Sequence, residues 1–594
     1  MTRSPNRSRR RSTPYPIGSV GDWIRSLRGY DGAQDCPFWP PDLFAIVGSL
    51  LRRTGVYRQA FQVAETIPRI HRLTPGADEW ERARIVGERW RNTLDLALSR
   101  PTALQDLRVL IPNDVAQWWK VLFKAATWEL RAFARADAFN SGRRYKGRVR
   151  YPQDPVIAAI CLVIASDEAC AGVGLAGREE VAEGPQATPF LSALAAVLES
   201  PEQDFRTLCV TVSAGHVAVL PKQHTPQVGL TFRSMSHHLA LIPAGEIRAR
   251  WFEQRPKTDA RIYNLLLLPW PLETHPNDFV LVASNGSGGG AQLFEYRPRK
   301  PSDPRHVSRW VERAIQKANK LGGPINVVVL PESALSLSEY NQVEQVATRN
   351  GAILISGVRL TASETTEGGP INACVMQTRG FLKPGRVSSA ALELSRFVQA
   401  KHHRWCLSRT QILSYGLGNR LPATGKLWEN IALPDRELNF LSVGSWMTWC
   451  TLICEDLARQ EPAAEVVRAV GPNLVIALLM DGPQLTNRWP ARYATGLAED
   501  PGSSVLTFTN LGLTKRSRAL TDLNTENFQP NRTIALWRDA CSEPHEIRIG
   551  PSDTACILSL ACQSQEEFTA DGRGDNRQAH HPIYAGHQGF SVSP

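Results

Sequence analysis

Apolar residues recur at helical spacing through the first third of the chain. The pattern is clearest over residues 42–51, 77–98, 115–139 and 156–171. Apolar side chains three and four positions apart share one face of a helix, so this spacing predicts helices that pack together. We therefore predict a mainly helical domain over residues 17–204.

Short apolar runs of strand length replace this pattern after residue 205. Residues 208–212, 216–220 and 238–242 are rich in Val, Leu and Ile and are bounded by polar loops. Runs of this kind are typical of β-strands. We predict a small β-containing connector over residues 205–258.

Strand-like and helix-like segments alternate in the second half of the chain. Residues 262–268, 326–330 and 352–356 are apolar runs, and residues 307–321 and 340–348 between them have helical spacing. Such alternation predicts an α/β layered fold, which we place at residues 259–565. Residues 566–594 are polar and rich in Gly and His, and we predict a mobile polar tail there.

Length and composition fit this division into several domains. A chain of 594 residues is too long for one hydrophobic core, and 42% hydrophobic with 21% charged residues is ordinary for globular domains. The longest apolar run, residues 156–165, is too short to cross a bilayer, so no membrane contact is expected.

The N-terminus is strongly basic and contributes to a net charge of +11. Five arginines fall within residues 3–11, and no acidic residue precedes Asp22. Ser12-Thr-Pro-Tyr follows, where an export signal would have an apolar segment, so we expect a cytoplasmic protein. Residues 1–16 are predicted to be a disordered basic arm, either a solvated tail or an arm that binds nucleic-acid phosphates.

The cysteines indicate reduced thiols rather than disulfides or a metal centre. The chain has 11 cysteines, an odd number, with no CxxC pair. The paired histidines, among them His402-His403 and His580-His581, lack ligand partners at usable spacing. No metal site and no cofactor are expected.

Three short segments carry candidate chemistry. Val327-Val-Val-Leu-Pro-Glu-Ser runs from an apolar strand into Glu332, and Lys401-His-His-Arg-Trp begins the second segment. The third, Thr451-Leu-Ile-Cys-Glu-Asp-Leu, ends a strand at Cys454. In this order they resemble the signature of the nitrilase superfamily, the carbon–nitrogen hydrolases, over the C-terminal half of the chain. The segment starting at Ile371-Asn-Ala-Cys-Val resembles a further landmark strand of that family.

The resemblance implies a fold, an activity and a set of site residues. It implies an α-β-β-α sandwich that hydrolyses a small-molecule amide or nitrile, with Cys454 as nucleophile, Glu332 as general base and Lys401 stabilising the oxyanion. Glu429, ahead of Cys454, stands where the family has a second, supporting glutamate. The family also implies a homodimer or a higher oligomer.

The chemistry of these residue types agrees with that role. A thiol attacks poorly until its proton is removed, and a neighbouring carboxylate can take that proton. A buried ammonium can stabilise the tetrahedral oxyanion that follows. Taken singly, Cys454 would be a core residue, while Glu332 and Lys401 would be solvated surface charges.

A second hypothesis is a non-catalytic or regulated effector. In it, the nitrilase-like domain serves as a binding or assembly module, and the N-terminal half binds a partner or nucleic acid. A large extra domain ahead of a divergent nitrilase-like domain resembles modules found with bacterial reverse transcriptases in antiviral defence. No Tyr-x-Asp-Asp polymerase motif occurs in this sequence.

Overall fold

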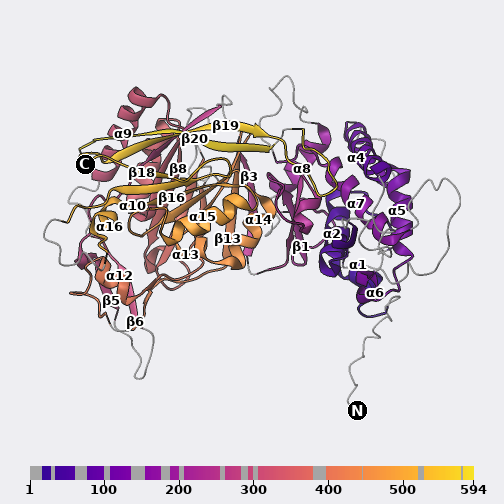
Figure 1. Cartoon of the computed structure of the whole chain (residues 1–594), viewed down its shortest axis with the longest axis horizontal. Coiled ribbons are helices and arrows are strands. Elements are labelled where there is room, and N and C mark those ends of the chain that lie inside the picture. The colour runs from indigo at the N-terminus through magenta and orange to yellow at the C-terminus, as the bar shows by residue number, and fades with distance from the viewer. Residues whose placement is uncertain are drawn as a thin grey trace, which may run out of the picture.

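The computed structural model places two lobes side by side, a helical one and a β-sandwich (Figure 1). The described residues are 16–28, 34–60, 77–99, 107–135, 154–174, 188–199, 207–245, 247–254, 261–282, 292–298, 305–378, 396–423, 425–444, 446–519, 528–576 and 579–593. The predicted basic arm therefore lies outside the described residues, apart from Pro16.

The N-terminal lobe is helical, as its apolar spacing predicts. Its central helix α7 (Pro155–Ala169) is buried on every side and begins at Asp154, whose side chain accepts a hydrogen bond from the Val156 backbone at 2.8 Å. Four other helices surround it or extend the bundle: α2 (Pro40–Thr54), α4 (Ala77–Leu98), α5 (Asn113–Phe123) and α8 (Pro189–Glu199). Trp118 and Trp119 of α5 are buried, as expected for core residues.

The prediction of a single helix over residues 115–139 is wrong. Helix α5 ends at Phe123, and α6 (Leu130–Arg135) follows after a turn. The turn carbonyls of Ala126 and Trp128 accept hydrogen bonds from the first residues of α1 (Val20–Arg28). The chain breaks there because these carbonyls bind α1 instead of continuing their own helix.

The strand expected over residues 208–212 is also absent from the structure. The buried Asp42 carboxylate, on α2, accepts backbone hydrogen bonds from Val210 and Thr211 at 2.9 and 3.0 Å. A side chain thus satisfies donors that a neighbouring strand would otherwise take. The other two runs form strands as predicted, and β1 (Val217–Pro221) pairs antiparallel with β2 (Leu239–Pro243).

Two seven-stranded sheets build the C-terminal lobe. The first has the order β10-β9-β8-β7-β4-β19-β20, and the second has the order β18-β17-β16-β15-β14-β13-β3. The first comprises β4 (Ile262–Leu267), β7 (Val327–Ser336), β8 (Ile353–Leu360), β9 (Ile371–Gln377), β10 (Arg396–Ala400), β19 (Ala555–Gln565) and β20 (Ala579–Phe590). The second comprises β3 (Ile247–Gln254), β13 (Arg436–Val443), β14 (Met447–Ile453), β15 (Leu474–Leu479), β16 (Ser504–Thr509), β17 (Thr533–Arg538) and β18 (His545–Arg548).

These sheets form the middle layers of an α-β-β-α sandwich, so the predicted fold class is confirmed. Apolar side chains of both sheets, such as Leu265 and Ile476, share one core between them. Helices α9 (His306–Gly322) and α10 (Leu337–Arg349) cover the outer face of the first sheet. Helices α14 (Glu465–Val470) and α15 (Trp489–Glu499) cover the second sheet, in a core that continues into the helical lobe.

The sandwich extends beyond the predicted boundaries on both sides. Strand β3 lies in the predicted connector, yet it pairs in parallel with β13. The predicted mobile tail at 566–594 is wrong over β20, which pairs with β19 along its length. Because β20 is an edge strand that is only partly buried over much of its length, its sequence carries the polar residues that suggested a tail.

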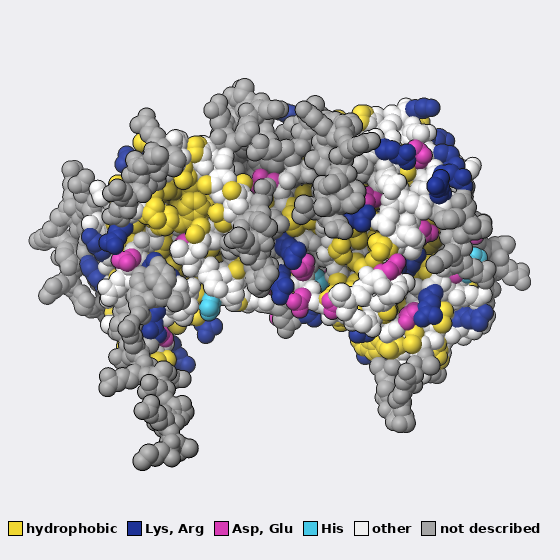
Figure 2. Space-filling view, turned by 180° about the vertical axis from the view of Figure 1, so that it is seen from behind, with side chains coloured by type: hydrophobic (Ala, Val, Ile, Leu, Met, Phe, Trp, Pro, Cys, Tyr) yellow, Lys and Arg dark blue, Asp and Glu magenta, His cyan; other side chains and the backbone are white. Residues whose placement is uncertain are grey.

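A small sheet of four strands, in the order β11-β12-β6-β5, stands beside the sandwich. It comprises β5 (Phe279–Val282), β6 (Gln292–Tyr296), β11 (Cys406–Leu407) and β12 (Leu427–Glu429). Among the described helices, none combines the length and apolar character needed to cross a membrane. On the face in Figure 2, Lys and Arg side chains lie interspersed with Asp and Glu.

Candidate active site

Glu332 lies at an irregularity in the middle of β7. The pairing of β7 with β8 shifts register between Leu330 and Leu335, and Ser333 has a positive φ of 52°. The neighbouring strand makes room for this bulge with a glycine. A Cβ on Gly357 would lie 2.3 Å from the Pro331 carbonyl and 2.6 Å from the Glu332 Cα. The bulge turns the Glu332 side chain into the interior, where it is buried.

Gly357→Ala should therefore displace Glu332. With Glu332 as the general base that the sequence predicts, hydrolysis should fall on the order of 10²-fold, since a shift of about 1 Å in a catalytic group has that effect. Overpacking should also lower the free energy of unfolding by about 1–3 kcal/mol. The matched control is Gly496→Ala in α15, where an added Cβ meets nothing within 4 Å. Equal activities of the two variants would refute this role for Gly357.

Lys401 directly follows β10, and its backbone N–H donates to the Asn372 carbonyl at 2.8 Å. Its ammonium is fully buried and donates to two carboxylates. The Nζ lies 2.7 Å from Glu332 Oε1 and 2.7 Å from Glu429 Oε2. The structure thus brings the side chains of Lys401, Glu332 and Glu429 into direct contact, which are three of the four predicted site residues.

Glu429 ends β12 and is fixed by further donors. Its Oε2 also accepts the Trp405 backbone N–H at 3.0 Å. The Asn372 amide donates to Glu332 Oε1 at 2.8 Å and to Glu429 Oε1 at 2.9 Å. Lys401 and Asn372 together therefore clamp the two carboxylates at a fixed separation. Glu332 Oε2 has no hydrogen-bond partner among the described residues, which leaves it available to accept a proton.

Cys454 sits at a sharp turn between β14 and the short helix α13 (Glu455–Ala458). Its backbone has φ 48° and ψ −105°, a conformation that non-glycine residues rarely adopt. The Cys454 N–H donates to the Leu478 carbonyl of β15 at 2.9 Å, which holds the turn in place. The thiol is buried, and the charges of the Glu332 carboxylate and the Lys401 ammonium both act on it.

Electrostatics keep the resting thiol protonated and the lysine charged. Burial, followed by the Glu332 carboxylate, raises the pKa of Cys454 well above its ordinary value. Burial lowers the pKa of Lys401, but Glu332 and Glu429 outweigh it and raise that pKa well above normal. Burial also raises the pKa of Glu332, with Lys401 opposing and Glu429 adding to the rise. A carboxylate with a raised pKa is a better proton acceptor at neutral pH.

Asp456 and Gln399 position these groups, and the motifs alone did not single them out. Asp456, two residues after Cys454, accepts the His402 backbone N–H at 3.1 Å. It also binds the His403 ring at 3.0 Å. Gln399 donates from the first sheet to the Thr451 carbonyl of the second at 2.8 Å. The lysine segment is thereby tied to the cysteine segment on both sides of the site.

The four predicted residues form a closed site. Glu332 and Lys401 are 1% exposed, Cys454 is 2% exposed and Glu429 is 8% exposed. A cavity of about 560 Å³ lies at the same end of the sandwich, but none of the four lines it. Among the described residues, substrate therefore has no wide opening to the thiol in this conformation.

The structure also assembles histidines that the sequence left without partners. His224, Glu567 and His581 bring potential metal-ligand atoms together, and so do Asp167, Glu168 and His238. In the first cluster Glu567 binds the His224 ring at 2.9 Å. In the second, Asp167 accepts backbone N–H groups, including that of His237 at 2.7 Å. Neither cluster contains a residue of the candidate site.

Solved structures of the nitrilase superfamily resemble half of this chain. A variant of the Nesterenkonia AN1 amidase matches with 11% identity and a TM-score of 0.29, covering 50% of this chain and 90% of its own. A carbon-nitrogen hydrolase from Helicobacter pylori G27 matches with 12% identity and a TM-score of 0.28, covering 48% and 86%. Saccharomyces cerevisiae Nit3, from branch 10 of the superfamily, matches with 11% identity and a TM-score of 0.30, covering 52% and 93%.

No protein-family model and no curated protein matches the sequence. Structural likenesses of this size carry no argument about activity. The interpretation of the site therefore rests on its own contacts.

Proposed function

We propose that the C-terminal lobe hydrolyses a carbon–nitrogen bond of an amide or nitrile through a thioester on Cys454. The observation that carries this proposal is the buried Lys401 ammonium, held at 2.7 Å from both Glu332 and Glu429, with the charges of Lys401 and Glu332 acting on the buried Cys454 thiol. A buried charge is retained only where it is paired, and a cysteine that a base and a cation both influence is suited to acyl transfer.

The proposed reaction with an amide begins with proton transfer. Glu332 takes the thiol proton as Cys454 attacks the carbonyl carbon, and Lys401 stabilises the oxyanion. Glu332 then gives that proton to the departing nitrogen, which leaves as ammonia or an amine. Water, deprotonated by Glu332, attacks the thioester and releases the acid and the thiol. Glu429 holds Lys401 in place throughout.

A second candidate, a regulated effector, is favoured by the packing behind the nucleophile. Cys454 and Leu457 belong to the same apolar core as α2 and α7 of the helical lobe. A partner that shifts the helical lobe could therefore reach the cysteine turn. Nucleic acid at the basic arm, a homodimer, a cytoplasmic location and a role in antiviral defence remain predictions from the sequence.

Thiol labelling separates these two functions. Iodoacetamide is the size of a small amide, so an opening that admits substrate also admits this reagent, and Glu332 then takes the thiol proton. For a catalytic site we therefore expect Cys454 to react much faster than the exposed Cys541. Glu332→Gln should remove this preference because it removes the base. Peptide mass spectrometry over a time course gives the two rates. Labelling of Cys454 at or below the rate of Cys541 would favour the non-catalytic effector.

A further inference from the structure

Three buried side chains that could hold a metal ion lie together outside the candidate active site. His224 is in the loop after β1, Glu567 is in the segment between β19 and β20, and His581 is on β20. One possible ligand atom of each lies within 4.8 Å of the other two, and all three residues are buried. Imidazole nitrogens and carboxylate oxygens are ligands that zinc takes in proteins.

The spacing of these atoms fits a single zinc ion. Glu567 Oε1 lies 2.9 Å from His224 Nδ1 and 3.5 Å from His581 Nε2. Zinc bonds of about 2.0 Å place neighbouring ligand atoms of a tetrahedral site about 3.3 Å apart. The two distances lie on either side of that value, so small side-chain movements are enough to complete the site.

His581 provides a second and independent indication of a ligand. The residue is 4% exposed, and neither nitrogen of its ring makes a hydrogen bond within the described part of the chain. Buried polar groups in proteins nearly always have a hydrogen-bond partner. A metal ion bound to Nε2 gives this nitrogen the partner that it lacks.

The carboxylate is oriented for such an ion. Glu567 Oε2 accepts the Thr225 backbone N–H at 2.5 Å, which leaves Oε1 for the two histidines. Support of this kind is usual for a carboxylate that binds a metal. A Cβ built on Gly502 would lie 3.7 Å from His581 Cε1 and 3.9 Å from Glu567 Oε1. Gly502 thus faces the cluster without a side chain, which leaves room for water as the fourth ligand.

Metal binding changes one hydrogen bond of the cluster. The Asn473 amide donates to His224 Nε2 at 3.3 Å, which places the ring proton on Nδ1, where Glu567 accepts it. Zinc takes the place of that proton on Nδ1, and the proton moves to Nε2. Asn473 loses only this long contact, because its amide also donates to the His580 carbonyl at 2.5 Å.

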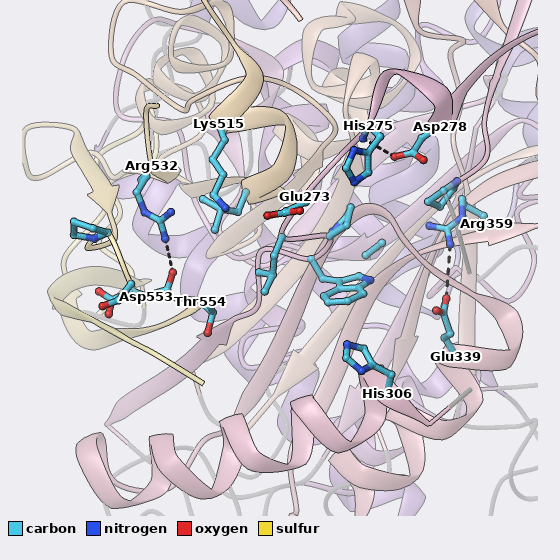
Figure 3. A pocket seen from close by; sticks show the side chains of 18 residues that line it. Glu273, His275, Asp278, His306, Glu339, Arg359, Lys515, Arg532, Asp553 and Thr554 are labelled. Atoms are coloured by element: carbon cyan, nitrogen blue, oxygen red, sulfur yellow. Dashed lines mark hydrogen bonds and ion pairs between the residues drawn. The ribbon is translucent and has the colours of Figure 1, made fainter. Parts of the chain in front are cut away.

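Other histidines of the described residues are less suited to a metal ion. In the second cluster Arg573 pairs with Glu168 and, at 3.5 Å, with Asp167, so a guanidinium already supplies the positive charge there. In the cavity of about 560 Å³, Figure 3 shows His275 and His306 on different walls. Neither belongs to a possible metal-binding group within the described ranges.

We propose that His224, Glu567 and His581 bind one Zn²⁺ ion, which ties the two lobes together. Side chains of β1, just ahead of His224, share the core of the helical lobe, whereas β19 and β20 belong to the sandwich. His224 and Glu567 are 343 positions apart, so spacing along the chain could not indicate this set. The ion is structural and takes no part in the proposed hydrolysis.

Titration of the full chain with Zn²⁺, after metal has been removed by a chelator, tests this site in competition with a coloured zinc indicator. We expect His581→Gln and Glu567→Gln to bind the ion at least tenfold more weakly than the wild type. His580→Gln is the matched control and should bind as the wild type does. His580 is the neighbouring histidine on β20, and its ring binds Ser564 Oγ at 3.0 Å.

Thermal melts of the same proteins give a second measurement. Zn²⁺ should raise the melting temperature of the wild type and of His580→Gln, because an ion that binds only the folded state stabilises it. It should raise that of His581→Gln and Glu567→Gln much less. Melts without metal check that each variant is folded.

Cobalt identifies the ligands in the wild type without any substitution. Co²⁺ should give the visible absorption of a tetrahedral site of nitrogen and oxygen, without the near-ultraviolet band of a cobalt–thiolate bond. A thiolate band would place the ion on cysteines and overturn the proposal. No binding of Zn²⁺ to the wild type, or equal affinities of the wild type and His581→Gln, would overturn it as well.

Discussion

Cys454→Ala is expected to abolish hydrolysis while leaving the fold intact. Without the sulfur no thioester forms, and only binding and oxyanion stabilisation remain, so the rate should fall on the order of several hundred-fold or more. The thiol is small and contributes little packing, so the free energy of unfolding should change by no more than about 1 kcal/mol. Ammonia release from a panel of small amides measures the rate.

Cys450→Ala is the matched control for this experiment. Cys450 lies on β14, the strand that leads into Cys454; it is also buried, and burial alone raises the pKa of its thiol. Replacing it removes a comparable sulfur atom without touching Glu332 or Lys401. Activity should survive in this variant. If Cys454→Ala hydrolyses amides at the wild-type rate, the nucleophile lies elsewhere.

Lys401→Met should lower both the rate of hydrolysis and the free energy of unfolding. The substitution removes the oxyanion stabiliser, which is worth on the order of 10²–10³ in rate. It also leaves Glu332 and Glu429 buried without their shared cation. Breaking a buried ion pair on one side typically costs about 3–5 kcal/mol of unfolding free energy. Urea unfolding of the wild type and the variant measures that loss.

The loss of unfolding free energy in Lys401→Met should depend on pH in a defined direction. Lys401 lowers the pKa of Glu332 against the effect of burial, so its removal raises that pKa further. A carboxyl group whose pKa is higher in the folded than in the unfolded state favours folding when protonated, and this contribution is lost as pH rises. Lys401→Met should therefore be closer to wild-type stability at pH 5 than at pH 8.

A double variant identifies the cause of this instability. Lys401→Met with Glu332→Gln removes one of the unpaired carboxylates, so it should recover stability at pH 8 without recovering activity. A single variant Lys401→Met as stable as the wild type at pH 8 would mean that the ion pairs do not hold this site together.

Glu332 and Cys454 were predictable because each directly follows an apolar run in a segment that resembles the nitrilase signature. The run before Glu332 opens β7 and the run before Cys454 is β14, and both are buried. Asn372 stood within a recognised strand, but its clamp joins carboxylates 40 and 57 positions away. Contacts at such separations leave no periodic signal in one sequence.

The errors in the predicted fold also arise from contacts between residues that are far apart in the sequence. Asp42 takes backbone donors from residues about 168 positions away, and this replaces the strand expected there. Strand β20 is paired on one side only, so its polar residues resemble those of a tail. In both cases tertiary contacts override the local pattern, which carries no information about the partner.

The acyl-enzyme itself provides the most direct test of the proposed function. The full chain is incubated with a panel of small amides and nitriles, quenched rapidly with acid, and digested for mass spectrometry. For at least one amide, we expect an acyl group on the Cys454 peptide, with the mass of the amide less ammonia, and none in Cys454→Ala. Ammonia release by the wild type with no acyl group on Cys454, or with the acyl group on another residue, would contradict it.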